Sequence, residues 1–148
     1  GVYFLVGHLM MKGFILPPFS SAAANQRVAA GERIDWLSSE VEGIRKTRDV
    51  GAVAMIDFWA EWCSACLELE KTTWTDAEVI KETKKQVNIK INCTNTNDPK
   101  IKQLWAKYGV VGLPTIIFID KNGVVMKDKT ITGFVDAVGF LQRLKGLE

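Results

Sequence analysis

The chain alternates between short apolar runs of strand length and longer stretches with the spacing of amphipathic helices. Residues 52–59 and 115–119 are almost continuously apolar, which is typical of central strands buried on both faces. Residues 87–92 alternate apolar and polar positions and predict another strand. One helix is predicted to begin at Asp35, and another to follow the strand at 52–59 and extend up to Lys85. Two more helices are predicted at 98–108 and 135–147.

Capping and turn residues bound these segments and indicate the topology. Asp35 is the predicted cap of the first helix, and Asp98 followed by Pro99 predicts the start of a later one. Residues 120–123 read Asp-Lys-Asn-Gly and predict a hairpin turn into a strand at 124–126. Strands joined through helices favour parallel pairing, whereas a hairpin requires antiparallel pairing. We therefore expect an α/β fold with a mixed central sheet and helices on both faces.

The composition fits one such domain. The chain has 148 residues, of which 47% are hydrophobic, and this is enough for a single core without covalent cross-links. Its 19 lysines and arginines against 17 acidic residues give no electrostatic reason to expect a nucleic acid partner. We place the compact domain at residues 32–148.

Residues 1–31 differ in character from the rest of the chain. Residues 2–19 are largely apolar, but His8 and Lys12 interrupt them, so they are too broken for a complete membrane span. Residues 20–31 are rich in Ser, Ala, Asn and Gln and predict a linker. The apolar stretch is interpreted as the tail of a membrane helix or as the remnant of a secretory signal, and both place the domain outside the cytosol. An apolar arm that docks on the domain is the third interpretation, and the initial glycine suggests a fragment or a processed form.

Three cysteines are too few for a scaffold held by disulfides. Cys63 and Cys66 form one C-x-x-C pair and Cys93 lies far from it, so the pair is interpreted as chemical and Cys93 as a half-buried free thiol. A zinc-binding module that uses these cysteines and His8 is the alternative from a different class. Because a second closely spaced ligand pair is missing, we expect no metal.

The C-x-x-C pair predicts dithiol–disulfide exchange. In that reaction a thiolate attacks a disulfide sulfur, and a second thiol resolves the mixed disulfide. Cys63 should begin a helix, where unpaired backbone amides and the helix dipole favour a thiolate, so it is the predicted nucleophile. Cys66, one turn further on and followed by Leu67, is the predicted resolving thiol. No cofactor is expected beyond the redox-active disulfide itself.

Two carboxylates are candidates for proton transfer and for tuning the pair. Asp57 interrupts a buried strand, where a carboxylate is costly unless it is protonated or paired. Beneath the cysteines it would accept and return the proton of Cys66, with a pKa raised by burial; a solvated strand end is the alternative. Glu70, one turn beyond Cys66, is the second candidate, with a solvated surface position as its alternative. Anionic neighbours disfavour the thiolate and predict a reductant, not an oxidant.

Pro114 stands immediately before the apolar strand at 115–119. A proline has no amide hydrogen and is unusual next to a central strand. A cis bond after Leu113 would explain it, whereas a trans proline that starts the strand is the alternative. A cis turn would expose the backbone of Leu113 for pairing with an extended substrate segment beside Cys63.

The motif Asp-Phe-Trp-Ala-Glu-Trp-Cys-Ser-Ala-Cys at 57–66 and the Gly-Leu-Pro-Thr at 112–115 closely resemble the thioredoxin family. The resemblance covers roughly residues 35–147 and implies a thioredoxin fold, although Ser-Ala replaces the family's usual Gly-Pro between the cysteines. It implies a buried acid at Asp57, a nucleophile at Cys63, a resolving cysteine at Cys66, and substrate-binding residues Trp62, Leu113 and the cis-proline Pro114.

Other segments look more like the C-terminal periplasmic domain of DsbD proteins, namely the Ser-Ala between the cysteines, residues 66–71, residues 95–98 and Thr-Gly-Phe at 132–134. In that family the domain takes electrons from a membrane-embedded domain and passes them to an N-terminal periplasmic domain. Glu70 matches a second acidic residue of the family, while Leu67 stands where Lys is common.

This resemblance implies a protein-disulfide reductase in the bacterial periplasm, anchored to the inner membrane in the full-length protein. Its expected partners are protein dithiols and disulfides, chiefly those of other domains of the same membrane reductase. The alternatives are a stand-alone thioredoxin, which would be cytoplasmic, and a thiol reductase for cytochrome c maturation.

Overall fold

The computed structural model describes residues 31–147, and the compact unit within it begins at Arg33. The expectations of a membrane-helix tail, a signal remnant or an arm, followed by a linker, concern residues that lie outside this described part, apart from Gly31. Among the described residues no helix is both long and apolar enough to cross a bilayer.

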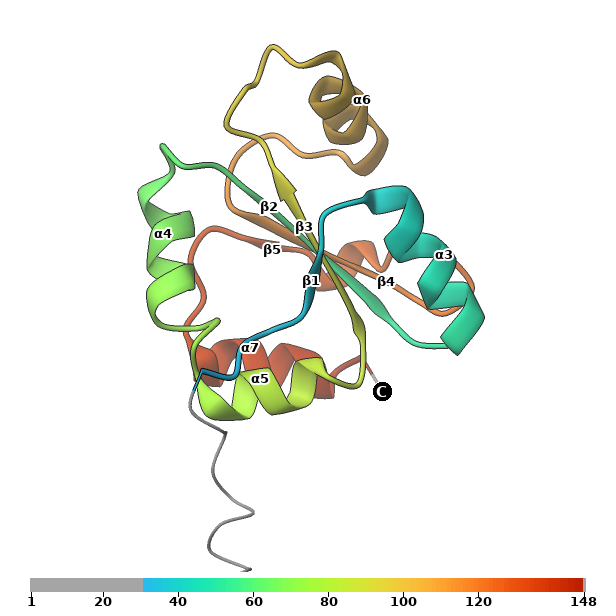
Figure 1. Cartoon of the computed structure of the whole chain (residues 1–148), viewed down its shortest axis with the longest axis vertical. Coiled ribbons are helices and arrows are strands. Elements are labelled where there is room, and N and C mark those ends of the chain that lie inside the picture. Colours follow the sequence, from blue (N-terminus) through green and yellow to red (C-terminus); the bar gives the residue numbers. More distant parts are fainter. Residues whose placement is uncertain (1–30, 148) are drawn as a thin grey trace, which may run out of the picture. The chain divides into compact units, whose positions relative to one another are not determined.

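A mixed sheet of five strands, in the order β1-β3-β2-β4-β5, forms the centre of the compact unit (Figure 1). The β1–β3 and β2–β3 pairs are parallel, whereas the β2–β4 and β4–β5 pairs are antiparallel. The expected mixed sheet is confirmed. The strands are β1 (Trp36–Leu37), β2 (Ala54–Trp59), β3 (Val87–Asn92), β4 (Thr115–Ile119) and β5 (Ile131–Thr132).

Helices cover both faces of this sheet (Figure 1). Because side chains alternate along a strand, β2 presents Ile56 and Phe58 to one face and Met55 and Asp57 to the other. Helices α3 and α6 cover the first face, and α4, α5 and α7 cover the second. The helices are α3 (Glu40–Val50), α4 (Ser64–Lys71), α5 (Ala77–Thr83), α6 (Pro99–Tyr108) and α7 (Ala137–Lys145), with a short 3-10 helix η1 (Lys127–Lys129).

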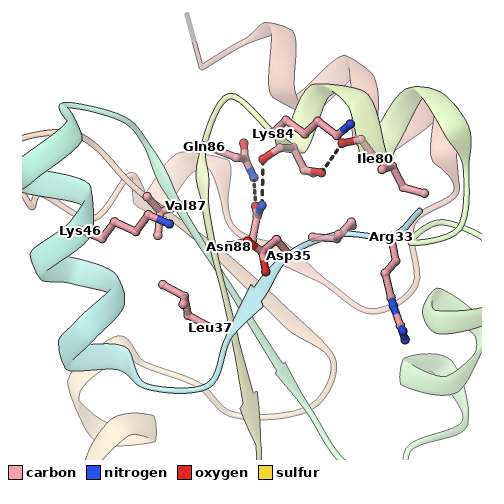
Figure 2. Close-up of a pocket in the computed structure, with 11 residues that line it drawn as sticks. Arg33, Asp35, Leu37, Lys46, Ile80, Lys84, Gln86, Val87 and Asn88 are labelled. Carbon is pink, nitrogen blue, oxygen red and sulfur yellow. Dashed lines mark hydrogen bonds between the residues drawn. The ribbon is translucent and has the colours of Figure 1, made fainter. Parts of the chain in front are cut away.

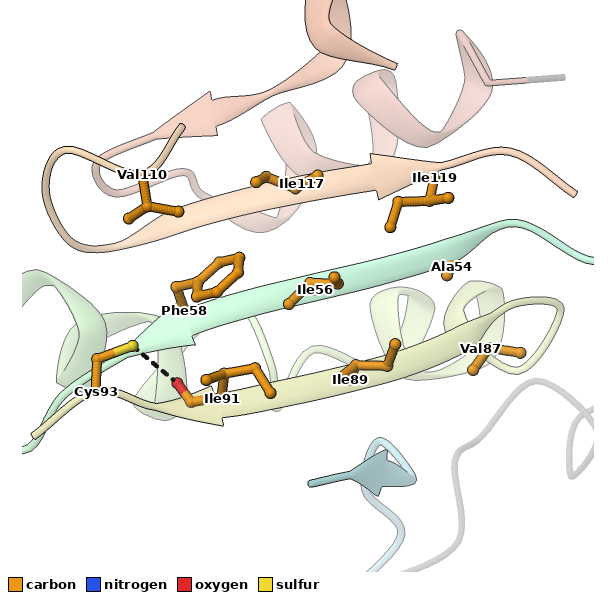
Figure 3. Close-up of a cluster of buried hydrophobic side chains, with 10 residues drawn as sticks. All are labelled: Ala54, Ile56, Phe58, Val87, Ile89, Ile91, Cys93, Val110, Ile117 and Ile119. Carbon is orange, nitrogen blue, oxygen red and sulfur yellow. Dashed lines mark hydrogen bonds between the residues drawn. The ribbon is translucent and has the colours of Figure 1, made fainter. Parts of the chain in front are cut away.

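The core under α3 and α6 consists of alternate residues of the three central strands (Figure 3). Half-buried side chains of the two helices, such as Ile44 and Leu104, pack against it. Gly43 allows α3 to lie close to the sheet, since a Cβ atom there would lie 2.2 Å from Cδ1 of Ile89. The buried members of this cluster are Ala54, Ile56, Phe58, Val87, Ile89, Ile91, Cys93, Val110, Ile117 and Ile119.

The first helix starts later than its periodicity predicts. Ser39, not Asp35, is the cap of α3, and its Oγ accepts a hydrogen bond from the Glu42 amide at 3.2 Å. Trp36 and Leu37 form β1 instead, paired with the start of β3. The prediction of a helix from Asp35 was wrong because pairing with the sheet edge satisfies the backbone of these residues and outweighs local helix propensity.

The segment after the cysteines forms two helices and not one. Asp76 caps α5 by accepting hydrogen bonds from the amides of Glu78 and Val79 at 3.0 and 3.1 Å. The intervening residues 72–76 hold three threonines, whose side chains bond to backbone carbonyls and favour a helix end. This break places Trp74 in a linker that packs against the sheet.

The connections around β4 also differ from the prediction. The hairpin turn forms at 120–123, but residue Val125 makes only one bridge, to Ile119, and β5 lies further along the chain. β4 is antiparallel to β2 even though α6 precedes it. Helix α6 and its loops lie at the end where β3 finishes, so the chain enters β4 from that same end (Figure 1).

Candidate active site

Cys63 and Cys66 form a disulfide beyond the carboxyl end of β2, with their Cα atoms 5.2 Å apart. Cys63 is the cap of α4, and its Sγ accepts a hydrogen bond from the Cys66 amide at 3.2 Å. The helix therefore directs backbone N–H groups at the sulfur of Cys63. These groups stabilise negative charge on that sulfur once the disulfide is reduced.

The two cysteines differ in accessibility. Cys63 keeps 7% of its surface exposed and Cys66 2%. Trp59, Ala65 and Leu113 pack against the pair. An incoming sulfur can therefore reach Cys63 more readily than Cys66.

The loop that holds Pro114 lies against the disulfide. The Leu113–Pro114 peptide bond is cis, and the half-buried side chain of Leu113 contacts the cysteines. The Pro114 carbonyl accepts a hydrogen bond from the Gly133 amide at 3.0 Å. The backbone hydrogen bonds of the described residues include none to Leu113. Its main chain is thus available to an extended peptide beside the disulfide.

Trp62 lies on the surface immediately before Cys63 and is 59% exposed. Its indole N–H donates to the Thr94 carbonyl at 3.0 Å, and the Thr94 hydroxyl accepts from the Glu61 amide at 3.0 Å. The loop after β3 therefore orients the exposed indole. Sequence reasoning missed Thr94, because nothing local links it to a residue more than thirty positions earlier.

Asp57 is buried, with 1% of its surface exposed. Its Oδ2 accepts a hydrogen bond from the indole Nε1 of Trp74 at 3.1 Å, while Oδ1 has no hydrogen-bond partner in the described part of the chain. Burial raises the pKa of Asp57 from 3.8 to about 6, and the charge of Lys90 and the Trp74 hydrogen bond oppose that rise. Asp57 lies on the sheet face that α4 covers, and it is not a solvated strand end.

Lys90 joins Asp57 and Glu70 into one charged cluster. It is the register partner of Asp57 across β2 and β3, and its ammonium forms an ion pair with Glu70. The same ammonium lies 4.9 Å from the ring centroid of Trp59 and 5.3 Å from that of Trp36. Burial lowers the pKa of Lys90, and the charge of Asp57 opposes this effect.

The structure brings Glu70 to Lys90. The Glu70 side chain is 38% exposed, so it is neither fully solvated nor buried among the cysteines. Sequence reasoning missed both Lys90 and Trp74. The alternation of β3 marks Lys90 as facing the same side as Asn88, but the sheet register, which the sequence does not show, decides that it faces Asp57.

Cys93 is free and fully buried, whereas the sequence predicted a half-buried thiol. Its Sγ accepts a hydrogen bond from the Trp105 indole at 3.2 Å and donates to the Ile91 carbonyl at 3.5 Å (Figure 3). Burial raises the pKa of the Cys93 thiol. Among the described residues no cluster of three or more His, Cys, Asp or Glu side chains is arranged to hold a metal ion, and His8 lies outside that part.

A cavity of about 180 Å³ lies near the start of β3 (Figure 2). The disulfide follows the carboxyl end of β2, which runs parallel to β3, so the cavity and the disulfide lie at opposite ends of these strands. The Asn88 amide in the cavity wall donates to the Thr83 carbonyl and accepts from the Gln86 side chain, each at 2.8 Å. The polar groups of Asn88 thus serve the fold.

Comparisons with known proteins identify the family of this chain. Residues 42–148 match a family model described as a thioredoxin-like domain. The thiol:disulfide interchange protein DsbD of Photorhabdus laumondii is 41% identical over 101 residues, which are 68% of this chain and 17% of that protein. The DsbD of Colwellia psychrerythraea is 30% identical over 90% of this chain and 22% of its own length. The chain thus spans about a fifth of the length of these relatives.

Solved structures show the same fold. The oxidised C-terminal domain of DsbD from Neisseria meningitidis aligns with a TM-score of 0.64 and 21% identity, over 76% of this chain and 98% of that one. A thioredoxin from Thermus thermophilus aligns with a TM-score of 0.67 and 21% identity, over 78% of this chain and 88% of its own. These likenesses confirm the expected thioredoxin fold. The chain therefore belongs to the thioredoxin-like domain family, is related to DsbD proteins, and carries the Cys63–Cys66 disulfide at the start of α4.

Proposed function

We propose that this domain acts as a reductant that receives electrons from a membrane-embedded domain and passes them to disulfides of periplasmic proteins. The observation that carries the proposal is the position of the Cys63–Cys66 disulfide, at the amino end of α4 and beside the unpaired backbone of Leu113. The similarity to DsbD proteins supports the membrane-embedded electron source, the periplasmic location and the tether in the full-length protein.

Each turnover moves two electrons and two protons. In the reduced domain the Cys63 thiolate attacks the partner's disulfide, forms a mixed disulfide and releases one partner thiolate. Cys66 then gives its proton to Asp57 and attacks the Cys63 sulfur, which releases the second partner thiolate and forms the Cys63–Cys66 disulfide. Asp57 returns this proton to one partner thiolate, the other partner thiolate takes from solvent the proton that Cys63 lost on ionisation, and the partner leaves as a dithiol.

The carboxylates of Asp57 and Glu70 support a reducing role. Asp57 and Glu70 share the single ammonium of Lys90, so the cluster carries an excess of negative charge when both carboxylates are ionised. Negative charge near the cysteines disfavours the reduced, anionic form of the pair and favours loss of its electrons. Trp62 and Leu113 provide an exposed indole and a free peptide edge for contact with a protein substrate.

Equilibration of the domain with glutathione buffers tests the direction of electron flow. The variant Cys93→Ser restricts the titration to the Cys63–Cys66 pair. We expect a reduction potential far below that of a strong oxidant, toward the thioredoxin value of roughly −270 mV. A potential near that of DsbA, about −120 mV, would overturn the reductant assignment.

A second assay tests the electron source. The oxidised domain is mixed with reduced membrane domain of a DsbD relative, or with thioredoxin reductase and NADPH. Rapid reduction by the membrane domain is expected. Rapid reduction by thioredoxin reductase alone would favour a stand-alone thioredoxin and contradict the membrane-linked role.

A further inference from the structure

The two carboxyl oxygens of Asp57 lie in unequal surroundings. Oδ2 accepts the hydrogen bond from the Trp74 indole at 3.1 Å, whereas Oδ1 is buried with no hydrogen-bond partner in the described residues. An indole N–H can only donate. Oδ2 is therefore held as an acceptor, which disfavours a proton on that oxygen.

Packing fixes the Trp74 indole in this position. Trp74 is 3% exposed, and its ring makes edge contacts with Trp36 and Phe140 at centroid distances of 5.6 and 4.9 Å. Its backbone amide donates to the Leu69 carbonyl at 2.9 Å, which ties the residue to the end of α4. The indole cannot turn away from Asp57 without losing these contacts.

Other charged and titratable groups act on Asp57 from several elements. Lys90 on β3 favours the carboxylate through its charge, and its ion pair with Glu70 on α4 limits that effect. The buried thiol of Cys93 follows β3, and Cys66 on α4 titrates only after reduction of the disulfide. In the oxidised protein, Trp74 thus acts on Asp57 through a hydrogen bond, whereas Lys90 acts on it through its charge.

We propose that Trp74 is a positioning residue for proton transfer, because its indole holds Oδ2 of Asp57 as an acceptor and leaves Oδ1 as the oxygen that takes up and returns the proton. The inference rests on the proposed role of Asp57 as the proton acceptor for Cys66. In the transfer, the S–H bond of Cys66 breaks, an O–H bond forms at Oδ1, and the Cys66 thiolate attacks the mixed disulfide.

The first experiment compares the titration of Asp57 in oxidised wild type and in Trp74→Phe, by carbon-13 NMR of aspartate carboxyl groups with Asp57→Asn for assignment. Phe keeps an aromatic ring against Trp36 and Phe140 but lacks the N–H. Loss of a hydrogen bond to a charged group should raise the Asp57 pKa by about one pH unit. Trp105→Phe, which removes the indole donor to Cys93, is the matched control and should leave the titration of Asp57 within a few tenths of a unit.

The second experiment uses only the wild-type protein, so it does not depend on whether a variant folds. The Nε1–H proton signal of Trp74 in the wild type should shift with the midpoint of the Asp57 titration, because its acceptor changes charge. A signal that stays constant through that titration, or an unchanged pKa in a folded Trp74→Phe protein, would overturn the inference.

Infrared spectra of protonated Asp57 test which oxygen carries the proton. With the proton on Oδ1, the carbonyl is Oδ2, so Trp74→Phe removes its hydrogen bond and the C=O stretch moves to higher frequency. With the proton on Oδ2, the carbonyl is Oδ1 and the stretch stays in place, which contradicts the assignment.

The pH profile of mixed-disulfide resolution separates this inference from the proposed function. If the profile moves upward together with the Asp57 pKa in Trp74→Phe, both stand. If the pKa moves and the profile does not, Asp57 is not the proton acceptor, and the part of our inference that concerns proton transfer fails with it.

Discussion

Lys90 lies directly opposite Asp57 in the parallel pair of β2 and β3. Its ammonium does not interact with Asp57 alone, because it also forms the ion pair with Glu70 and lies over the rings of Trp59 and Trp36. The protonation of Asp57 therefore depends on a cluster of groups from four elements, β1, β2, β3 and α4.

Replacement of Asp57 by Asn should change how stability depends on pH. The folded pKa of Asp57, about 6, lies above its ordinary value of 3.8, so this group contributes stability below pH 4 that is lost as the pH rises through 6. Above that range the buried carboxylate costs about 2–3 kcal/mol. Denaturant unfolding of the oxidised proteins measures the difference in unfolding free energy between Asp57→Asn and wild type. This difference should shift in favour of Asp57→Asn by that amount when the pH is raised from 3.5 to 7.5.

The exposed carboxylate of Asp128, on η1, provides the control for this measurement. Asp128→Asn should follow the wild-type curve. A stability difference between Asp57→Asn and wild type that does not vary with pH would contradict the raised pKa.

Lys90→Met and Glu70→Gln should move the pKa of Asp57 in opposite directions. Removal of the Lys90 charge deletes the largest influence that opposes burial, so the pKa should rise further above 6. Removal of the Glu70 charge leaves Lys90 to act on Asp57 alone, so the pKa should fall. NMR titration of the oxidised proteins measures the pKa of Asp57 in both variants. Lys102→Met, which removes an exposed charge on α6, is the control. If Lys90→Met and Glu70→Gln shift the pKa of Asp57 in the same direction, Asp57 and Glu70 do not share the Lys90 ammonium.

Cys66→Ser should trap protein partners, whereas Cys63→Ser should not. Cys63 is the more exposed cysteine and caps α4, so it attacks first, and without Cys66 the mixed disulfide persists. The covalent complex is detected as a reducible band after incubation with an oxidised protein substrate. Trapping through Cys66 in the Cys63→Ser variant would reverse the assignment, and Cys93→Ser, which removes the buried free thiol, should behave like wild type.

Glu40→Gln should weaken the packing of α3 on α6. Glu40 is 9% exposed and accepts hydrogen bonds from the Lys107 ammonium at 2.6 Å and from the Tyr108 hydroxyl. Burial alone would raise its pKa, but these bonds and the charge of Lys107 lower it below 4.5. The variant should lose about 1–3 kcal/mol of unfolding free energy at pH 7.

The pH dependence of unfolding provides a second test of the role of Glu40. A depressed folded pKa contributes stability that is present above the ordinary pKa of 4.5 and lost as the pH falls through the folded value. The difference in unfolding free energy between Glu40→Gln and wild type should therefore become smaller as the pH falls below 4.5. Glu42→Gln, an exposed neighbour on the same helix, should show neither the loss nor the narrowing.

Local patterns were sufficient for the elements that position the cysteines. The strands at 87–92 and 115–119 have the predicted bounds, and Asp98 caps α6 with Pro99 in its first turn, as predicted. These features depend on periodicity and capping, which residues a few positions apart decide. The cysteine spacing likewise follows from one helical turn, so the redox pair could be predicted from the sequence.

Tertiary structure alone decided which groups surround that pair. The register of β2 and β3 places Lys90 opposite Asp57, the break between α4 and α5 brings Trp74 to Asp57, and edge pairing turns Trp36 into a strand residue. These contacts join residues far apart along the chain, and they depend on strand register and on how side chains fill the core. The apolar pattern of a strand does not determine these contacts, because a shift of two residues in register keeps every side chain on its face and still changes its cross-strand partner.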